Sequence, residues 1–76
     1  MYFIFNKENN RFFGGMNGAG RYIFEGFTAL DDNIRCVIFS SEVDACAAGN
    51  ELIRAGYDKV SVHPISEFES LANRRN

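Results

Sequence analysis

Few side chains in this chain of 76 residues could support acid–base or nucleophilic chemistry. His63 is the single histidine, and the sequence places no carboxylate or thiol beside it, which favours a solvated or partly hydrogen-bonded strand histidine. Ser40 and Ser41 could be nucleophiles at a strand-to-helix turn. They lack the flanking glycines of a G-x-S-x-G elbow, however, and helix capping explains both hydroxyls. The sequence therefore predicts no catalytic residues and no enzyme, unless subunits of an oligomer pool their side chains.

Candidate metal ligands are equally sparse. Asp31 and Asp32 form an adjacent acidic pair, but the later bidentate glutamate and the glycine of a calcium loop are missing, which favours a plain turn. Cys36 and Cys46 show no Cys-x-x-Cys spacing and no nearby histidine pair, so we interpret both as small apolar core residues. We expect no metal site and no cofactor.

A glycine cluster, GGMNGAG, occupies residues 14–20, where converging backbone amides could hold a phosphate. The cluster lacks the Gly-Lys-Ser/Thr ending of a P-loop and the spacing of a dinucleotide fingerprint, and the strand-like RYIFEGF follows it. Two interpretations remain open. One is a mobile loop between strands, and the other is a recognition loop in which Asn17 and Arg21 offer hydrogen bonds to a partner.

The strand pattern begins with a predicted β-hairpin, Tyr2 to Phe5 and Arg11 to Phe13, joined by the turn KENN. Further strands are predicted over Arg21 to Phe27, Ile34 to Phe39 and Tyr57 to Pro64, with a turn over residues 28–33. The segment Ile34 to Phe39 is nearly continuous in apolar character, which predicts a central position in the sheet. A right-handed crossover to the last strand would follow if those two strands were parallel.

The helix pattern begins at Ser41, whose spacing to Asp44 is typical of a capping box, and ends at Gly56. Helical spacing puts Ala45, Gly49, Leu52 and Ile53 on one apolar face, and the glycine there indicates a close approach to the sheet.

A second capping-box pattern at Ser66 predicts a short C-terminal helix with Phe68 and Leu71 on one face. The predicted fold is α+β, with a single small domain spanning residues 1–76. It comprises a mainly antiparallel sheet of four to five strands, one amphipathic helix packed on one face and the short C-terminal helix.

The composition is that of a globular protein, with 46% hydrophobic and 24% charged residues. Eight Lys and Arg residues against 10 Asp and Glu give a net charge of −2, which lacks the basic footprint of a nucleic-acid-binding protein. The apolar start, MYFIF, is too short for a signal peptide or a membrane span. We expect a cytoplasmic protein with no membrane contact.

Large apolar side chains alternate onto both faces of the first strand, with Tyr2 and Ile4 on one face and Phe3 and Phe5 on the other. Two accounts of the second face remain open. Either the C-terminal helix covers it through Phe68, or part of it is an interface for a homodimer or a partner protein.

The chain as a whole resembles the small proteins encoded by bacteriophages, among them anti-defence inhibitors of the anti-CRISPR kind. The resemblance rests on the YFIF start, the segment DDNIRCVIFSSEVDA and the exit ELIRAGYDKVSVHPI, and it covers nearly the full length as a likeness of architecture. It implies a non-enzymatic anti-defence or host-takeover protein in the host cytoplasm, which either blocks a bacterial complex by binding or sequesters a nucleotide signal within an oligomer.

These observations lead to two functional hypotheses. In the first, the protein binds a host protein complex through Phe12, Phe13, Asn17 and Arg21 and exposed sheet aromatics. In the second, an oligomer binds a small nucleotide messenger with the amides of the glycine loop and Arg21.

Overall fold

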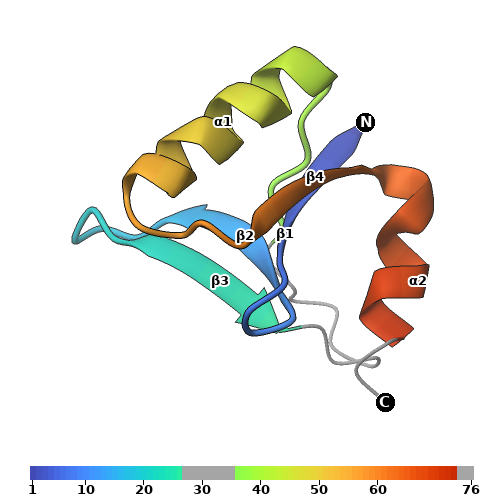
Figure 1. Cartoon of the computed structure of the whole chain (residues 1–76), viewed down its shortest axis with the longest axis horizontal. Coiled ribbons are helices and arrows are strands. Elements are labelled where there is room, and N and C mark those ends of the chain that lie inside the picture. Colours follow the sequence, from blue (N-terminus) through green and yellow to red (C-terminus); the bar gives the residue numbers. More distant parts are fainter. Residues whose placement is uncertain (27–35, 74–76) are drawn as a thin grey trace.

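The computed structural model describes residues 1–26 and 36–73 of the chain. In chain order the elements are β1 (Tyr2–Asn6), β2 (Arg11–Met16), β3 (Tyr22–Gly26), α1 (Glu42–Arg54), β4 (Val60–Pro64), a 3-10 turn (Ile65–Glu67) and α2 (Phe68–Asn73). The strands described form one antiparallel sheet in the order β3-β2-β1-β4 (Figure 1). The predicted α+β class is confirmed.

The β1–β2 hairpin forms where the sequence predicts it, because asparagines shape its turn. The side chain of Asn6, itself 2% exposed, accepts a hydrogen bond from the backbone N–H of Glu8 at 2.9 Å. Asn9 accepts one from the N–H of Arg11 at 3.1 Å, and Asn10 takes a left-handed φ of 56°.

The predicted glycine loop is shorter than expected, since its first two glycines belong to β2. That strand continues to Met16, and its register with β3 shifts between Phe13 and Gly15. Gly15 has a φ of 101°, and a Cβ built there would lie 3.6 Å from Cγ2 of Val37. The glycine therefore supports an irregularity in β2 beside the chain segment 36–39.

The prediction of a central strand over Ile34 to Phe39 is wrong for its described residues. Phe39 makes an isolated bridge with Tyr2, with N–H to O distances of 2.8 Å in both directions, and the N–H of Val37 donates to the carbonyl of Phe13 at 2.9 Å. These bonds put residues 37–39 between the start of β1 and β2, but they form a single bridge and no strand. The expected crossover accordingly lacks its first strand, and the turn predicted at Asp31 and Asp32 lies outside the described residues.

Helix α1 begins and ends as predicted. The hydroxyl of Ser41 accepts from the N–H of Asp44 at 3.2 Å, and Gly56 follows the helix with a φ of 106°. Ala45, Gly49 and Leu52 are buried, as expected from their spacing. Ile53, which was placed on the same face, is 47% exposed, so the buried stripe is narrower than predicted.

The two helices cover opposite faces of the sheet, and a hydrophobic cluster lies under each (Figure 1). The cluster between α2 and the sheet contains Phe3, Phe5 and Phe12 of the sheet and Leu71 of α2, with Cys36 and Phe68 packed against them. The cluster between α1 and the sheet contains Ile4 and Phe13 of the sheet and Leu52 of α1, with further apolar residues that include Val37 and Phe39. The apolar run 36–39 thus contributes to both clusters, which explains its composition without a strand.

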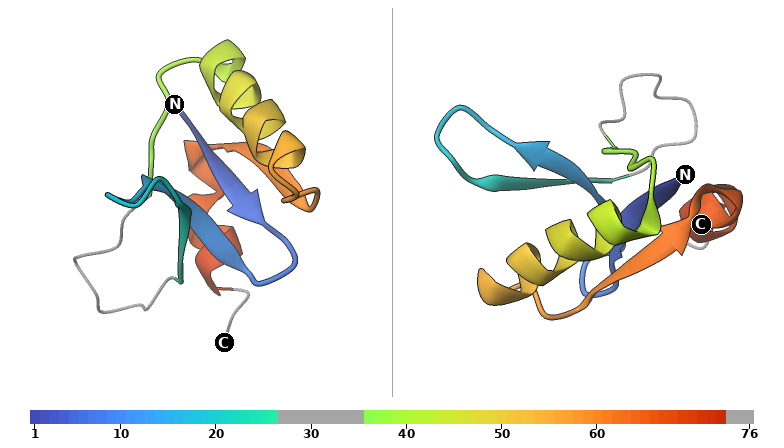
Figure 2. Two further views of the ribbon diagram at one scale, coloured as in Figure 1. Left: turned by 90° about the vertical axis from the view of Figure 1, so that its left-hand side faces the viewer. Right: turned by 90° about the horizontal axis from the view of Figure 1, so that it is seen from above.

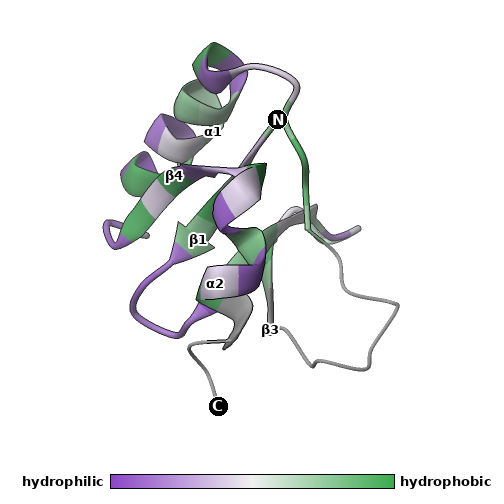
Figure 3. Cartoon of the chain, turned by 90° about the vertical axis from the view of Figure 1, so that its right-hand side faces the viewer, coloured by the Kyte–Doolittle hydropathy of each residue, from purple (hydrophilic) through white to green (hydrophobic). Residues whose placement is uncertain are grey.

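Helix α2 covers the second face of the sheet through Phe68, as the first of the two accounts of that face predicted. Seen from its own side, it lies across the sheet (Figure 3). The rings of Phe68 and Phe12 stack with centroids 4.7 Å apart, and Leu71 is 7% exposed. Ser66 does not cap this helix, because it falls inside the 3-10 turn, whose N-cap is Pro64 without a side-chain hydrogen bond.

We expect Gly49→Ala to stabilise the protein by about 0.5–1 kcal/mol, because alanine is the better helix former. The close approach predicted at this position is not tight, since a Cβ would lie 3.8 Å from Cγ2 of Val62, an ordinary contact. Gly49→Leu, by contrast, should overpack the site and cost about 1–3 kcal/mol. Urea denaturation of the wild type and the two variants measures both changes. A destabilised Gly49→Ala variant would contradict the conclusion that a Cβ fits at this position.

Candidate functional site

The structure corrects two of the four residues predicted to contact a partner. Phe12 is 0% exposed and Phe13 is 8% exposed, and they lie in the two clusters on opposite faces of the sheet. Alternation along β2 sends the rings in opposite directions, and each direction ends under a helix. Both phenylalanines are core residues, and neither can offer its ring to a partner in this fold.

The other two predicted residues, Asn17 and Arg21, lie at the exposed end of the β2–β3 hairpin. The side-chain oxygen of Asn17 accepts from the N–H groups of Ala19, at 2.9 Å, and Arg21, at 3.0 Å. Its carbonyl accepts from the N–H of Gly20 at 3.0 Å. The N–H of Asn17 itself donates to the carbonyl of Arg21 at 2.9 Å. Four loop amides are therefore used inside the loop, which removes them from the phosphate cradle of the second hypothesis.

The hairpin end extends away from β1 and β4 (Figure 2). Met16, the last residue of β2, is 56% exposed. Arg21, which directly precedes β3, is also exposed. The bonds made by Asn17 hold the backbone between them. The hairpin end, defined here as Met16, Asn17 and Arg21, is thus an ordered projection with one apolar and one cationic side chain.

A second group of polar residues, which the sequence did not predict as a site, gathers around His63. Its Nε2 lies 2.7 Å from Oγ of Ser61, and its Nδ1 lies 2.7 Å from Oε1 of Glu67. Ser61 and His63 share a face of β4 because they are two residues apart. Pro64 then ends the strand, and the 3-10 turn after it brings the carboxylate of Glu67 to Nδ1 of the ring.

Aromatic rings fix the orientation of the imidazole. The ring of Phe3 lies parallel to it, with centroids 5.7 Å apart and an interplanar angle of 24°. The ring of Phe5 meets it edge-on at 6.2 Å. The His63 side chain remains 20% exposed, so part of the imidazole is accessible to solvent.

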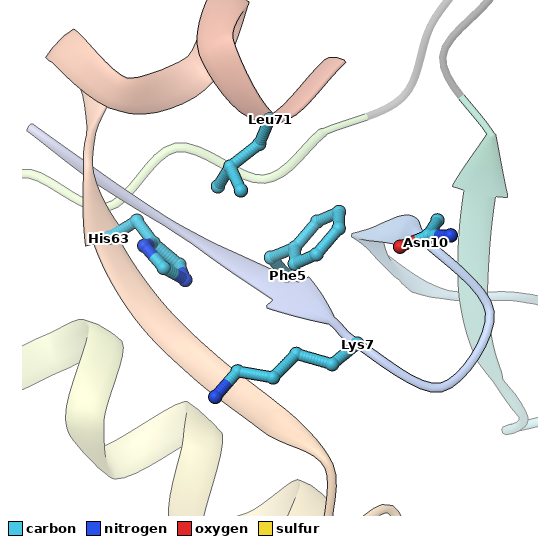
Figure 4. A pocket seen from close by; sticks show the side chains of 5 residues that line it. All are labelled: Phe5, Lys7, Asn10, His63 and Leu71. Carbon is cyan, nitrogen blue, oxygen red and sulfur yellow. The ribbon is translucent and has the colours of Figure 1, made fainter. Parts of the chain in front are cut away.

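His63 also borders a hollow of about 490 Å³, which is lined by Phe5, Lys7, Asn10, His63 and Leu71. In Figure 4, Lys7 and Asn10 come from the β1–β2 turn, Phe5 and His63 from the sheet, and Leu71 from α2. The volume falls in the range of small-molecule sites. An ammonium, a carboxamide and an imidazole around an apolar floor suit an anionic ligand with an apolar part.

Thiol chemistry is confined to one exposed position. Cys36 packs in the α2 cluster, as predicted, and burial raises the pKa of its thiol to about 11. Cys46 is exposed on α1, so the prediction that both cysteines are core residues is wrong for this one. Within residues 1–26 and 36–73, no three His, Cys, Asp or Glu side chains gather as metal ligands.

Comparison with protein-family models, curated proteins and solved structures found no match. Neither of the α-helices in the described part of the chain is long and apolar enough to cross a membrane.

The His63 group was missed because its third member depends on a turn. The alternation in SVH already put Ser61 and His63 on one face. Glu67 is four residues beyond the histidine, and only the 3-10 conformation after Pro64 decides that its carboxylate meets the ring. The sequence feature that could have indicated this group is the spacing of four residues between His63 and Glu67, with Pro64 between them.

Proposed function

We propose that this is a non-catalytic binding protein that blocks a bacterial protein complex through its hairpin end. The observation that supports the proposal is the projection of Met16 and Arg21 on a backbone held by Asn17. Methionine and arginine are enriched in protein interfaces, and an ordered loop loses less entropy on binding. The likeness to small phage proteins supports a host defence or takeover target in the host cytoplasm.

The chemistry of the hairpin end defines the partner surface. On the partner, we expect a carboxylate or a cluster of carbonyl oxygens that binds Arg21, and beside it an apolar depression that accommodates Met16. The homodimer hypothesis was based on an exposed second face of the sheet. Helix α2 covers that face, so the face does not support the hypothesis.

Affinity capture from a bacterial lysate tests the proposal. We expect the wild-type protein to retain one stoichiometric complex and the double variant Met16→Ser with Arg21→Glu to lose it by at least about tenfold, since charged interface residues cost about 2–5 kcal/mol when replaced. Lys59→Glu is the matched control, because it makes the same charge change at an exposed residue away from the hairpin. Equal capture by both variants would refute the assignment of this surface.

The hollow beside His63 supports a second candidate function, an oligomeric binder of a small nucleotide. Lys7 supplies the cationic side chain and Asn10 a hydrogen-bonding amide, in place of the loop amides that Asn17 already uses. Saturation with a cyclic or linear nucleotide at a hundred times its Kd should raise the melting temperature by about 10 °C or more. Lys7→Glu should abolish this rise and Arg54→Glu, at an exposed residue of α1 on the other side of the sheet, should keep it, whereas no rise with any nucleotide would exclude the candidate.

A further inference from the structure

We propose that Ser61 is an activated nucleophile that accepts an acyl group from small activated esters, with His63 as its base and Glu67 as the residue that orients the base. This inference goes beyond the proposed function, because it concerns β4 and not the hairpin end. It concerns the acylation step alone and does not depend on a protein partner.

The directions of the two hydrogen bonds follow from their chemistry. An ionised carboxylate only accepts, so the Glu67 contact of 2.7 Å requires the proton on Nδ1 of His63. In the neutral imidazole Nε2 is then an acceptor, and the hydroxyl of Ser61 donates to it, with 2.7 Å between Oγ and Nε2. A hydroxyl bonded to an imidazole that a carboxylate orients is the arrangement by which serine nucleophiles are activated.

The surroundings keep this arrangement in place and leave it accessible. Stacking on the fully buried Phe3 restricts rotation of the imidazole, and Ser61 itself is only partly buried. The hydroxyl of Ser61 lies on the α2 side of β4, because alternation puts it on the face of His63 and not on that of Val60 and Val62, which pack under α1. The ester therefore approaches it from the side of the larger hollow that His63 borders.

The register of β4 supplies a donor for the developing oxyanion. The N–H of Lys7 donates to the carbonyl of Lys59, and the N–H of Ile65 donates to the carbonyl of Met1. Antiparallel pairs alternate between bonded and non-bonded, so Val62, opposite Ile4, directs its N–H away from β1 at the sheet edge. The amide after the nucleophile is the donor that serine hydrolases with a nucleophile elbow also use.

The step is a balanced acyl transfer. Oγ of Ser61 attacks the ester carbonyl carbon while its proton passes to Nε2 of His63, giving a tetrahedral oxyanion beside the N–H of Val62. The bond from carbon to the leaving oxygen then breaks, and the leaving group takes the proton from His63. The products are an ester on Ser61 and a free alcohol or phenol, and no other reactant is needed.

The experiment uses p-nitrophenyl acetate with the full chain in a Cys46→Ala background, which removes an exposed thiol that the ester could also acetylate. We expect release of about one equivalent of nitrophenol per chain and, in peptide mass spectra, an acetyl group on Ser61. His63→Gln should slow acetylation about a hundredfold, and Glu67→Gln at least about tenfold. Ser61→Ala should remove the labelled peptide, whereas Ser66→Ala, at an exposed serine nearby, should leave the rate unchanged.

Glu67→Gln decides the matter if His63→Gln disturbs folding, because the Glu67 side chain is 51% exposed and supports no core packing. Acetylation of Ser61 no faster than that of Ser66, or a rate unaffected by Glu67→Gln in a folded protein, would overturn the proposal.

Discussion

Phe12→Ala is expected to lower the free energy of unfolding by about 3–5 kcal/mol, because it removes a fully buried ring. The ring centroid of Phe12 lies 5.6 Å from that of Phe3, 5.3 Å from that of Phe5 and 4.7 Å from that of Phe68. A domain this small rarely has more than about 3–5 kcal/mol of stability. Urea denaturation followed by circular dichroism should therefore show a largely unfolded variant at 25 °C.

Met16→Ala is the matched control for this experiment, since it truncates a 56% exposed side chain of the same strand. It should change the free energy of unfolding by less than about 0.5 kcal/mol. The pair also separates the two roles considered for Phe12. A partner-contact residue would tolerate alanine as Met16 does, and a near-neutral Phe12→Ala would contradict the core assignment.

Leu71→Asp is expected to detach α2 and expose the aromatic face beneath it. Leu71 is 7% exposed and packs with Phe3, Phe5 and Phe12, so the substitution places an unpaired carboxylate in an apolar cluster. The released face should bind the dye ANS strongly and make the protein associate at high concentration. ANS fluorescence and light scattering measure the two effects.

Ser70→Asp adds the same charge to the neighbouring position of α2, where the side chain is exposed. It should leave ANS binding and the measured mass unchanged. If Ser70→Asp and Leu71→Asp behaved alike, then α2 would not be the cover of this face.

The parts of the fold that were predicted from the sequence are those in which neighbouring residues decide the structure. Ser41 caps α1 and Gly56 ends it through contacts within a few positions, and asparagines shape the first turn. Gly14 and Gly15 were assigned to a loop because glycine is a poor strand former. In the structure they continue β2, where Gly15 supplies the left-handed φ at the register shift.

The parts that were missed depend on contacts between distant segments. The apolar run before Ser40 was taken for a central strand, because periodicity cannot distinguish a buried strand from a segment that fills two clusters. The burial of Phe12 and Phe13 depends on which helix covers each face, and that is decided by where α2 docks. The Ser61–His63–Glu67 group is local by contrast, and it was missed because only the conformation of the turn after β4 brings Glu67 to the histidine.

The pairing of β1 with β4 has a consequence for the kinetics of folding. Tyr2 lies opposite Pro64 and Phe3 opposite His63, so the first and last strands of the described chain are paired. Strand β1 lies inside the sheet, and β4 is the edge strand beside it. Closing so long a loop costs entropy before the contacts that reward it can form, and proteins rich in such pairings fold slowly for their size. The β1–β2 hairpin and the capped α1 are local and can form early, which leaves the addition of β4 as the step that commits the chain to its native topology.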